Sequence, residues 1–369
     1  MKKSNTWYKI LFKVLAIILA VIFLILGSYV LYICLQYYRI KDNENIPINN
    51  NQLLNVKVGD EYTISTYNIG FGAYTHDFSF FMDQGQTLDG KITQGSGSIA
   101  KNRQTVIDNT TGAVNTIVNK NVDFALFQEV DVAATRSHKY NQYQHIQNNF
   151  SSHSSSISMN FHSAFLFYPI FNPHGKTDAG IVTLSKYNIS SATRRSLPID
   201  ESFPTKFFDL DRCIQITRLP VENSQKELVI INAHLSAYDE GGIIRKQQLE
   251  FLNTILTEES AKDNYVVVGG DFNHDIANSS ELWSSAFKKP EWVYSLDDSN
   301  LTDGYRFVSA TNAPTCRSTD TSYTKGYNYT VVIDGFICSS NIETVAIENI
   351  DTDFQYSDHN PSVLKFKLK

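Results

Sequence analysis

An uncharged apolar run over residues 14–35 is the feature that most constrains the fold of this chain. As a helix it would extend about 33 Å at roughly 1.5 Å per residue, enough to cross a hydrocarbon core of about 30 Å. Trp7, Tyr8, Tyr37 and Tyr38 flank the run, where interfacial aromatic residues are common. The run therefore predicts a transmembrane helix, and the folded part of the protein must be built from the residues after it.

The charges around this run predict its orientation. Four lysines lie within residues 1–13, whereas the basic residues that follow the run are offset by Asp42 and Glu44. The positive-inside rule then predicts a cytoplasmic segment over 1–13, a signal anchor over 14–35 and an extracytoplasmic domain on a single-pass cell-membrane protein. A cleaved signal peptide is the alternative, disfavoured by the length of the run and by the lack of an A-x-A site after it. The polar, Asn-rich residues 36–58 predict a tether.

The composition is that of a globular domain. The chain has 369 residues, of which 42% are hydrophobic and 19% charged, with four cysteines and a net charge of −6. Four cysteines are too few for a disulfide-built scaffold. The first 41 residues contain no acid, so the remainder is more acidic than the whole chain. This charge disfavours a protein that binds nucleic acid through clustered cations, although a divalent metal would still allow an acidic site to bind phosphate.

Short apolar runs with strand character recur after the tether. They lie at 62–67, 124–127, 164–167, 181–184, 213–219, 228–233, 266–268, 331–338 and 363–369. Helical patterns occupy only about 99–120, 140–150 and 242–260. Many buried strands with few helices between them predict an α/β domain with two packed sheets and helices outside. No linker divides the segment, so residues 59–369 are expected to form one domain.

Polar residues follow several of these apolar runs directly. They are Asn68, Gln128, Glu129, His234, Asp271, Asn273, Asp334, Asp358 and His359. Each residue alone is typical of a turn or a cap. Because rigid strand ends and the loops beyond them commonly hold reactive groups, their recurrence predicts a site for a hard cation with acid and base groups beside it.

These residues fall within six short motifs. The motifs and their order along the chain resemble those of the endonuclease/exonuclease/phosphatase superfamily, which includes deoxyribonuclease I, neutral sphingomyelinases and inositol-polyphosphate phosphatases. The motifs are Thr66-Tyr67-Asn68, Gln128-Glu129, Asn232-Ala233-His234-Leu235, Gly270-Asp271-Phe272-Asn273, Ile333-Asp334 and Ser357-Asp358-His359. The resemblance spans about residues 62–369. It implies a four-layer α/β sandwich, with two packed mixed β-sheets flanked by helices, and a metal-dependent hydrolase of phosphate esters.

The resemblance also implies roles for the residues of these motifs. Glu129 would hold Mg²⁺ or Mn²⁺, with Asn68 and Asp358 close by. Asp271, oriented by Asn68 and Asn273, would position or deprotonate the attacking water.

Two histidines complete the implied catalytic set. His359, held by Asp334, would act as an acid or base or as a cation on the phosphoryl oxygens. His234 would bind a phosphate oxygen or assist the leaving group. Arg212 is a candidate for phosphate contact. The deoxyribonuclease I branch pairs the residue matching His234 with a Glu, and residues 160–165 offer no carboxylate for that pairing.

We therefore expect a membrane-anchored, extracytoplasmic, Mg²⁺-dependent phosphoesterase that needs no obligate protein partner. Its substrate is a phosphate ester, and a nuclease and a sphingomyelinase-like lipid phosphodiesterase both remain open. Contacts with lipid would come from the Phe-rich loop 71–81, including Phe80 and Phe81, and from Trp283, Phe287 and Trp292. A non-catalytic surface adaptor on the same fold is the alternative outside the enzyme class. The sequence leaves the number of metals, the disulfide state and the oligomeric state open.

Overall fold

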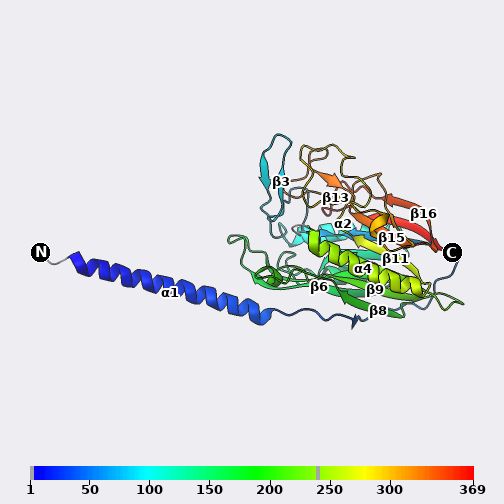
Figure 1. The fold of residues 1–369 in the computed structure, drawn as a ribbon, viewed down its shortest axis with the longest axis horizontal. Helices are drawn as coiled ribbons and strands as arrows, with labels where there is room; N and C mark the ends of the chain where they lie inside the picture. The colour runs from blue at the N-terminus through cyan, green and yellow to red at the C-terminus, as the bar shows by residue number, and fades with distance from the viewer. Residues whose placement is uncertain (1–3, 238–241) are drawn as a thin grey trace.

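The computed structural model describes residues 4–237 and 242–369 and shows a long helix that leads into a layered domain (Figure 1). The helix α1 (Ser4–Gln36) extends away from the domain, and its side chains are almost all exposed. In the described part of the chain, α1 is the one helix that is long and apolar enough to cross a membrane, a test that a signal sequence also passes. Residues 1–3 of the predicted cytoplasmic segment 1–13 lie outside the described residues.

Two large mixed sheets form the domain. The seven-stranded sheet has the order β1 (Glu44–Asn45), β8 (Ser191–Ser196), β9 (Cys213–Pro220), β10 (Glu227–His234), β11 (Tyr265–Asp271), β15 (Asp334–Ser339) and β12 (Tyr305–Val308). The six-stranded sheet has the order β16 (Ile342–Asn349), β17 (Ser362–Leu368), β2 (Glu61–Asn68), β5 (Phe124–Asp131), β7 (Gly175–Ser185) and β6 (Ser154–Leu166). Two-stranded ribbons join β3 (Gln84–Gln86) to β4 (Ile92–Gln94) and β13 (Cys316–Arg317) to β14 (Thr330–Val331).

The sheets pack face to face, and helices cover their outer faces. Inward-facing side chains of both sheets, such as Ile64 and Leu126 from one and Ile230 and Val267 from the other, share one buried cluster. The helices α2 (Arg103–Val118) and α3 (Gln142–Asn149) pack on the outside of the six-stranded sheet. The helix α4 (Ile243–Ala261) packs on the outside of the seven-stranded sheet. This arrangement confirms the four-layer α/β sandwich.

Among the predicted strands, β6 differs most from the sequence-based expectation, while β8, β12 and β16 have no counterpart in the predicted set. The apolar run 164–167 predicts a strand there, but β6 begins at Ser154, within a Ser-rich segment, and ends at Leu166. Its serines form part of a polar layer between the sheets, where Gln215 Nε2 donates a hydrogen bond of 2.6 Å to Ser156 Oγ. Periodicity of apolar residues cannot reveal a strand whose buried positions carry hydroxyl groups.

The predicted tether, residues 36–58, lies against the domain along its described length. The short strand β1 pairs with β8, Asn49 forms a bridge with Ser155, and Val56 is fully buried. Amide side chains hold the rest, since Asn51 Nδ2 donates to Ile189 O at 3.0 Å. A segment bound through backbone and amide contacts carries no hydrophobic pattern, which is why its composition resembles that of a free linker.

A pair of glycines lets β11 sit close to its neighbours. A Cβ at Gly269 would lie 2.7 Å from Leu126 Cδ1 of the opposite sheet, and one at Gly270 would lie 1.9 Å from the carbonyl oxygen of Ala233 on β10. Both positions therefore require glycine for close approach. Because Asp271 follows directly, the same approach sets where its carboxylate lies.

Replacing Gly270 with Ala should destabilise the protein, because the new methyl group would push β11 away from β10. Overpacking of this kind costs roughly 1–3 kcal/mol, so we expect the thermal unfolding midpoint to fall by several degrees. Gly27→Ala is the control, since nothing lies within 4 Å of a Cβ there. Equal midpoints for Gly270→Ala and wild type, measured by circular dichroism, would contradict this account of the glycine pair.

Candidate active site

The ends of four central strands bring the predicted site residues together. Strand β2 runs parallel to β5, and β10 runs parallel to β11, so their carboxyl ends meet at one edge of the sandwich. Side chains alternate along each strand, and Asn68, His234 and Asp271 fall on the inward-facing positions of β2, β10 and β11. The three side chains therefore converge between the two sheets, where they are almost completely buried.

Glu129 reaches the same place through a backbone irregularity. The pairing of β5 with β7 shifts register between Phe127 and Val130, and Glu129 has a φ of 57° in the left-handed region. Gln128 keeps the inward position that alternation gives it after Phe124 and Leu126, and the bulge re-aims Glu129. Gln128 Nε2 donates to Thr66 Oγ1 of the same sheet at 3.1 Å and to Asn232 Oδ1 of the opposite sheet at 2.8 Å. Of the predicted Gln128-Glu129 motif, Glu129 lines the cavity described below.

Hydrogen bonds from both sheets fix the Asp271 carboxylate. Asn68 Nδ2 donates to Asp271 Oδ2 at 3.0 Å, and the backbone N–H of Asn273 donates to Asp271 Oδ1 at 2.9 Å. The Asn273 side chain is itself held, because its Nδ2 donates to Leu235 O at 2.8 Å. The carboxylate therefore has a fixed orientation, with His234 Nε2 and His359 Nε2 lying 3.6 and 3.8 Å from Oδ2.

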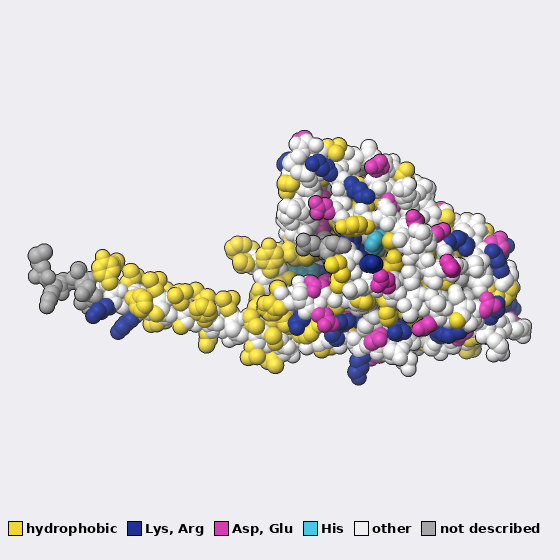
Figure 2. All heavy atoms as spheres, viewed as in Figure 1, with side chains coloured by type: hydrophobic (Ala, Val, Ile, Leu, Met, Phe, Trp, Pro, Cys, Tyr) yellow, Lys and Arg dark blue, Asp and Glu magenta, His cyan; other side chains and the backbone are white. Residues whose placement is uncertain are grey.

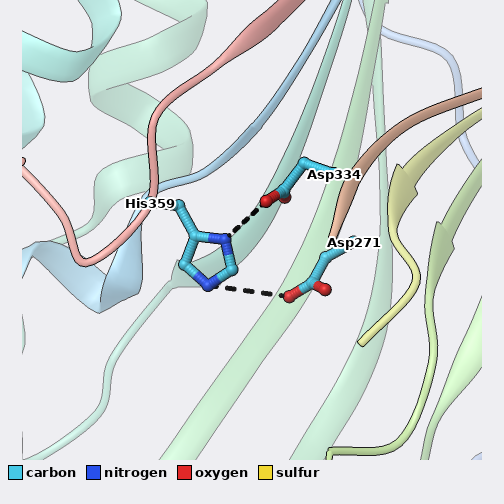
Figure 3. A group of neighbouring side chains, drawn as sticks. All are labelled: Asp271, Asp334 and His359. Carbon is cyan, nitrogen blue, oxygen red and sulfur yellow. Dashed lines mark hydrogen bonds and ion pairs between the residues drawn. The ribbon is translucent and has the colours of Figure 1, made fainter. Parts of the chain in front are cut away.

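His359 and Asp334 form a buried pair beside Asp271 (Figure 3). His359 Nδ1 lies 2.8 Å from Asp334 Oδ2. Burial alone lowers the pKa of His359, but the charges of Asp334 and Asp271 outweigh it and raise this pKa well above its usual value. Burial raises the pKa of Asp334 to about 6, against the charge of His359. At neutral pH the imidazole is therefore a cation whose Nε2 faces the site.

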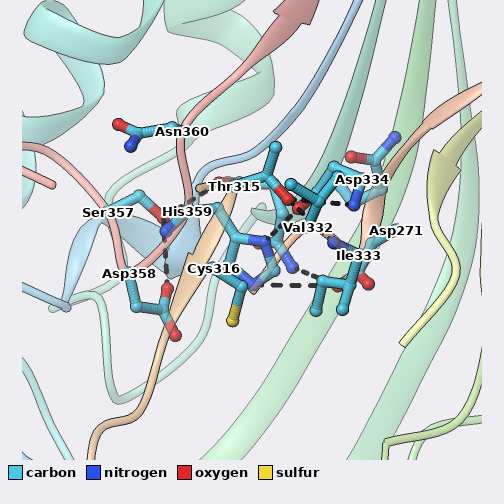
Figure 4. Close-up of polar contacts among 12 residues, drawn as sticks. Asp271, Thr315, Cys316, Val332, Ile333, Asp334, Ser357, Asp358, His359 and Asn360 are labelled. Carbon is cyan, nitrogen blue, oxygen red and sulfur yellow. Dashed lines mark hydrogen bonds and ion pairs between the residues drawn. The ribbon is translucent and has the colours of Figure 1, made fainter. Parts of the chain in front are cut away.

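The loop that carries His359 is tied to the neighbouring ribbon (Figure 4). The backbone N–H of Arg317 donates to Asp358 O at 3.0 Å, and the backbone N–H of Asn360 donates to Thr315 O at 2.7 Å. Ser357 Oγ donates to Asn68 O at 2.9 Å and lies 3.2 Å from Asp358 Oδ1. These bonds hold His359 and Asp358 in place although neither residue lies on a strand.

His234 has the opposite electrostatic character. Burial, together with the charges of Arg212 and His359, lowers the pKa of His234 well below its usual value. Within the described residues its Nδ1 has no hydrogen-bond partner, which agrees with the lack of a carboxylate in residues 160–165. Its Nε2 lies 3.9 Å from Glu129 Oε1. The site therefore combines a neutral imidazole with a protonated one, as in acid–base pairs whose pKa values are pushed apart.

The carboxylates at this edge carry more negative charge than the nearby cations neutralise. Burial and the charge of Asp358 raise the pKa of Glu129 to about 8, although its side chain remains 18% exposed to the cavity. A bound cation would relieve this repulsion between carboxylates. Carboxylate and amide oxygens are the ligands that Mg²⁺ and Mn²⁺ prefer. Glu129 and Asp358, which both line the cavity, therefore fit a hard divalent cation, whereas the Asn68 Oδ1 atom already accepts from the backbone N–H of Gly70 at 3.0 Å.

Another grouping also has the spacing of a metal site. Ligand atoms of Asp271, Asp334 and His359 all lie within 4.8 Å of one another. In that group the Nδ1 atom of His359 is already engaged with Asp334. We therefore favour the Glu129 side of the site for the cation.

These residues form the floor of a cavity of about 500 Å³. Glu129, His234, Asp271, Asp358 and His359 line it, as does Asn273, while Asn68 and Asp334 support the floor from behind. The structure thus brings all of the predicted site residues to this one place.

Arg212 also lines the cavity, as predicted for a phosphate contact, and is 5% exposed. Its Nη1 atom donates to Leu235 O at 2.6 Å.

Two further cavity-lining arginines were missed at the sequence level. Arg136 is buried and pairs with Asp131 at 2.9 Å, and Arg317 is 2% exposed, with its Nη2 atom donating to Thr75 O at 2.9 Å. Arg317 lies one residue after Cys316, on the short strand β13. Neither arginine belongs to a motif, so only the fold reveals that they face the same cavity.

Comparison with known proteins identifies the fold. A family model described as Endonuclease/Exonuclease/phosphatase family matches residues 66–359. The crystal structure of D. rerio TDP2 complexed with single-strand DNA product is similar at 13% identity with a TM-score of 0.52, covering 84% of this chain and 99% of that one. ANGEL2, a 2',3'-cyclic phosphatase in complex with adenosine-2',3'-vanadate, is similar at 14% identity with a TM-score of 0.52, covering 89% and 99%.

A protein of the same family description from Beutenbergia cavernae is similar at 14% identity with a TM-score of 0.51, covering 84% of this chain and 72% of that one. No curated protein matches the sequence. At these identities the structural likeness shows the fold, while the family model covers most of the chain and includes the site. The predicted family, fold and enzyme class are therefore confirmed, and the chain belongs to the Endonuclease/Exonuclease/phosphatase family of phosphoester hydrolases.

Proposed function

We propose that this protein is a membrane-anchored, Mg²⁺-dependent phosphoesterase whose catalytic domain lies outside the cytoplasm. One observation carries the catalytic part of the proposal. Asp271 has a fixed carboxylate that lies within 4 Å of both a neutral and a protonated histidine, next to a carboxylate-rich cation site. The anchor and its orientation rest on α1 and on the lysines that precede its apolar run.

The cation would be held by Glu129 and Asp358, with Asn68 nearby. When bound, Mg²⁺ polarises the scissile phosphate and neutralises charge that develops on it. The bulge at Glu129 supports this assignment, because a strained left-handed residue in a buried strand is commonly retained for a function.

Asp271 is the proposed base. Its carboxylate accepts bonds from Asn68 and from the backbone of Asn273, so it is held in one orientation, aimed at the cavity floor. A water beside it would be oriented for attack on phosphorus and would give its proton to this carboxylate as the bond forms.

The histidines are proposed to act on the phosphate. His359, kept protonated by Asp334, would donate from Nε2 to a phosphoryl oxygen or to the leaving group. His234, neutral and buried, would bind a second oxygen. Arg212 would add a positive charge at the cavity wall. These residues share the charge of the reacting phosphate without a covalent intermediate.

Replacing Asp271 with Ala should abolish most turnover, because the oriented base is lost. We expect the full chain in detergent with Mg²⁺ to hydrolyse bis(p-nitrophenyl) phosphate, and the variant to be slower by about 10²–10⁴-fold. Asp303→Ala, at an exposed carboxylate, is the matched control and should match wild type. Wild-type turnover that persists in EDTA, or in Asp271→Ala, would refute the proposed mechanism.

Replacing Glu129 with Gln should weaken cation binding, because the anionic ligand is lost. Titration calorimetry with Mn²⁺ is expected to show an affinity at least about tenfold lower than wild type. Glu250→Gln, on the exposed face of α4, is the control and should bind like wild type. Unchanged affinity in Glu129→Gln would move the cation to the group formed by Asp271, Asp334 and His359.

The same substitution should stabilise the metal-free protein near neutral pH. The pKa of Glu129 in the folded state is about 8, above its usual 4.5, so the folded protein loses stability as the pH rises between these values. With EDTA at pH 7.5, Glu129→Gln is expected to unfold at a higher temperature, on the order of 1–3 kcal/mol more stable. At pH 4 both forms are uncharged at this position and the difference should vanish. A lower midpoint for the variant at pH 7.5 would show that Glu129 is not electrostatically strained.

A further inference from the structure

The last turns of α1 pack against one end of the domain. Tyr29 stacks edge-on against Phe167 with ring centroids 5.4 Å apart, and its Oη donates to Phe165 O at 3.1 Å. Ile33 is 3% exposed and forms a buried cluster with Ala164 and Phe207. The domain is therefore joined to the apolar helix through side chains as well as through the backbone.

These contacts determine how close the domain lies to a bilayer that α1 crosses. At roughly 1.5 Å per residue, Tyr29 lies about 9 Å before Leu35, the end of the apolar run. If the run 14–35 is centred in the bilayer, Tyr29 lies about 7 Å from the midplane, within the hydrocarbon core, where the polar backbone of a packed domain is not tolerated. If the span instead begins at Trp7, Tyr29 lies about 33 Å further on, at the opposite interface. The contacts of Tyr29 with the domain therefore favour the second placement, which puts the loop after β6 at the membrane surface.

That loop is unusually apolar and exposed. We name Phe167, Tyr168, Ile170 and Phe171 the β6–β7 tip; their exposed fractions are 58%, 58%, 78% and 101%. Phe203, from a separate loop, adds another exposed ring at 66%. Figure 1 shows the loop after β6 projecting from the domain on the side from which α1 leaves, and Figure 2 shows hydrophobic side chains gathered along α1 and where it meets the domain. An exposed aromatic patch continuous with a membrane helix fits a lipid surface.

The β6–β7 tip is also continuous with the active-site cavity. Tyr168 belongs to both, and Leu166, one residue before the tip, lines the cavity wall. Phe81 lies beside Tyr168, with ring centroids 5.7 Å apart, and forms the wall together with Phe80, Met82 and Phe208. The cavity thus has a charged floor, which suits a phosphate, and an apolar wall that runs to the tip.

Resting on the proposed function, we propose that the β6–β7 tip inserts into the bilayer crossed by α1 and that the enzyme hydrolyses the phosphoester of a phospholipid in that bilayer. The polar headgroup phosphate would reach Asp271 and His359 on the floor, while the apolar wall would contact the glycerol or sphingoid part of the lipid.

A nucleic-acid substrate fits this surface less well. Binding a nucleic-acid strand requires accessible cations along its path. Of the three described arginines that line the cavity, Arg136 is engaged with Asp131, while Arg317 and Arg212 are 2% and 5% exposed, so they serve one phosphate in the cavity and not the path of a strand. The cavity wall toward the tip is built from aromatic and aliphatic side chains.

The structure changes which aromatic residues are expected to contact lipid. Phe71 and Phe287 are buried, Trp283 and Trp292 are partly buried, and Phe80 and Phe81 are half-buried in the cavity wall. The exposed set is the β6–β7 tip, which lies outside the predicted loop 71–81.

The test reconstitutes the full chain into vesicles of phosphatidylcholine, phosphatidylglycerol and sphingomyelin and follows lipid products by mass spectrometry, with bis(p-nitrophenyl) phosphate assayed in parallel. The variant Ile170→Ser/Phe171→Ser should hydrolyse lipid at least about tenfold more slowly, with the soluble ester changed by less than about twofold. Leu53→Ser/Leu54→Ser is the matched control, since these residues are 92% and 70% exposed near the opposite end of β6, and it should behave as wild type.

Docking is measured separately by quenching of Phe171→Trp in vesicles of dibrominated phosphatidylcholine, with Leu53→Trp as the reference. Stronger quenching at position 171 supports insertion, and equal quenching overturns it. Wild type that hydrolyses the soluble ester but none of the lipids overturns the lipid assignment alone, and preferential cleavage of single-stranded DNA would replace it with a nuclease. Wild type inactive even on the soluble ester would instead refute the proposed function.

Discussion

Repulsion between buried carboxylates is the constraint on which this active site depends. Glu129, Asp271 and Asp358 are brought to one sheet edge, where the arginines and His359 offset only part of their charge. The raised pKa of Glu129 expresses the remaining imbalance. In the proposed function a divalent cation would remove this imbalance, so the charges that strain the metal-free protein would favour the binding of a hard ion.

The sandwich tolerates this strain because hydrogen bonds hold Asp271 and His359 in place. Asp271 accepts bonds from both sheets, and His359 is held by Asp334 on a strand that pairs with β11. Between the sheets, Gln128 and Asn232 form a satisfied polar layer beneath the cavity. Because this support is rigid, the reactive groups need not reorganise when the reaction occurs.

The apolar helix α1 and the domain that holds the cavity are connected rather than independent. Contacts such as Tyr29 with Phe167 join the helix to one end of the domain, which would face the bilayer in the proposed anchored enzyme, and residues 36–58 bind along the domain instead of separating it from the helix. An enzyme held in one orientation at a surface meets substrates in that surface more often than substrates in solution. This arrangement links the proposed anchor to the choice of substrate.

The sequence by itself determined the apolar helix, most strands and the motif residues from Asn68 to His359, because hydrophobic period and short motifs are local properties of the chain. It did not reveal the serine-rich start of β6, the bound course of residues 36–58 or the exposed β6–β7 tip. Those features depend on which face of a strand is buried and on which distant segments meet. Only the tertiary structure decides that, since bulges such as the one at Glu129 and contacts between remote loops leave no periodic signal in the sequence.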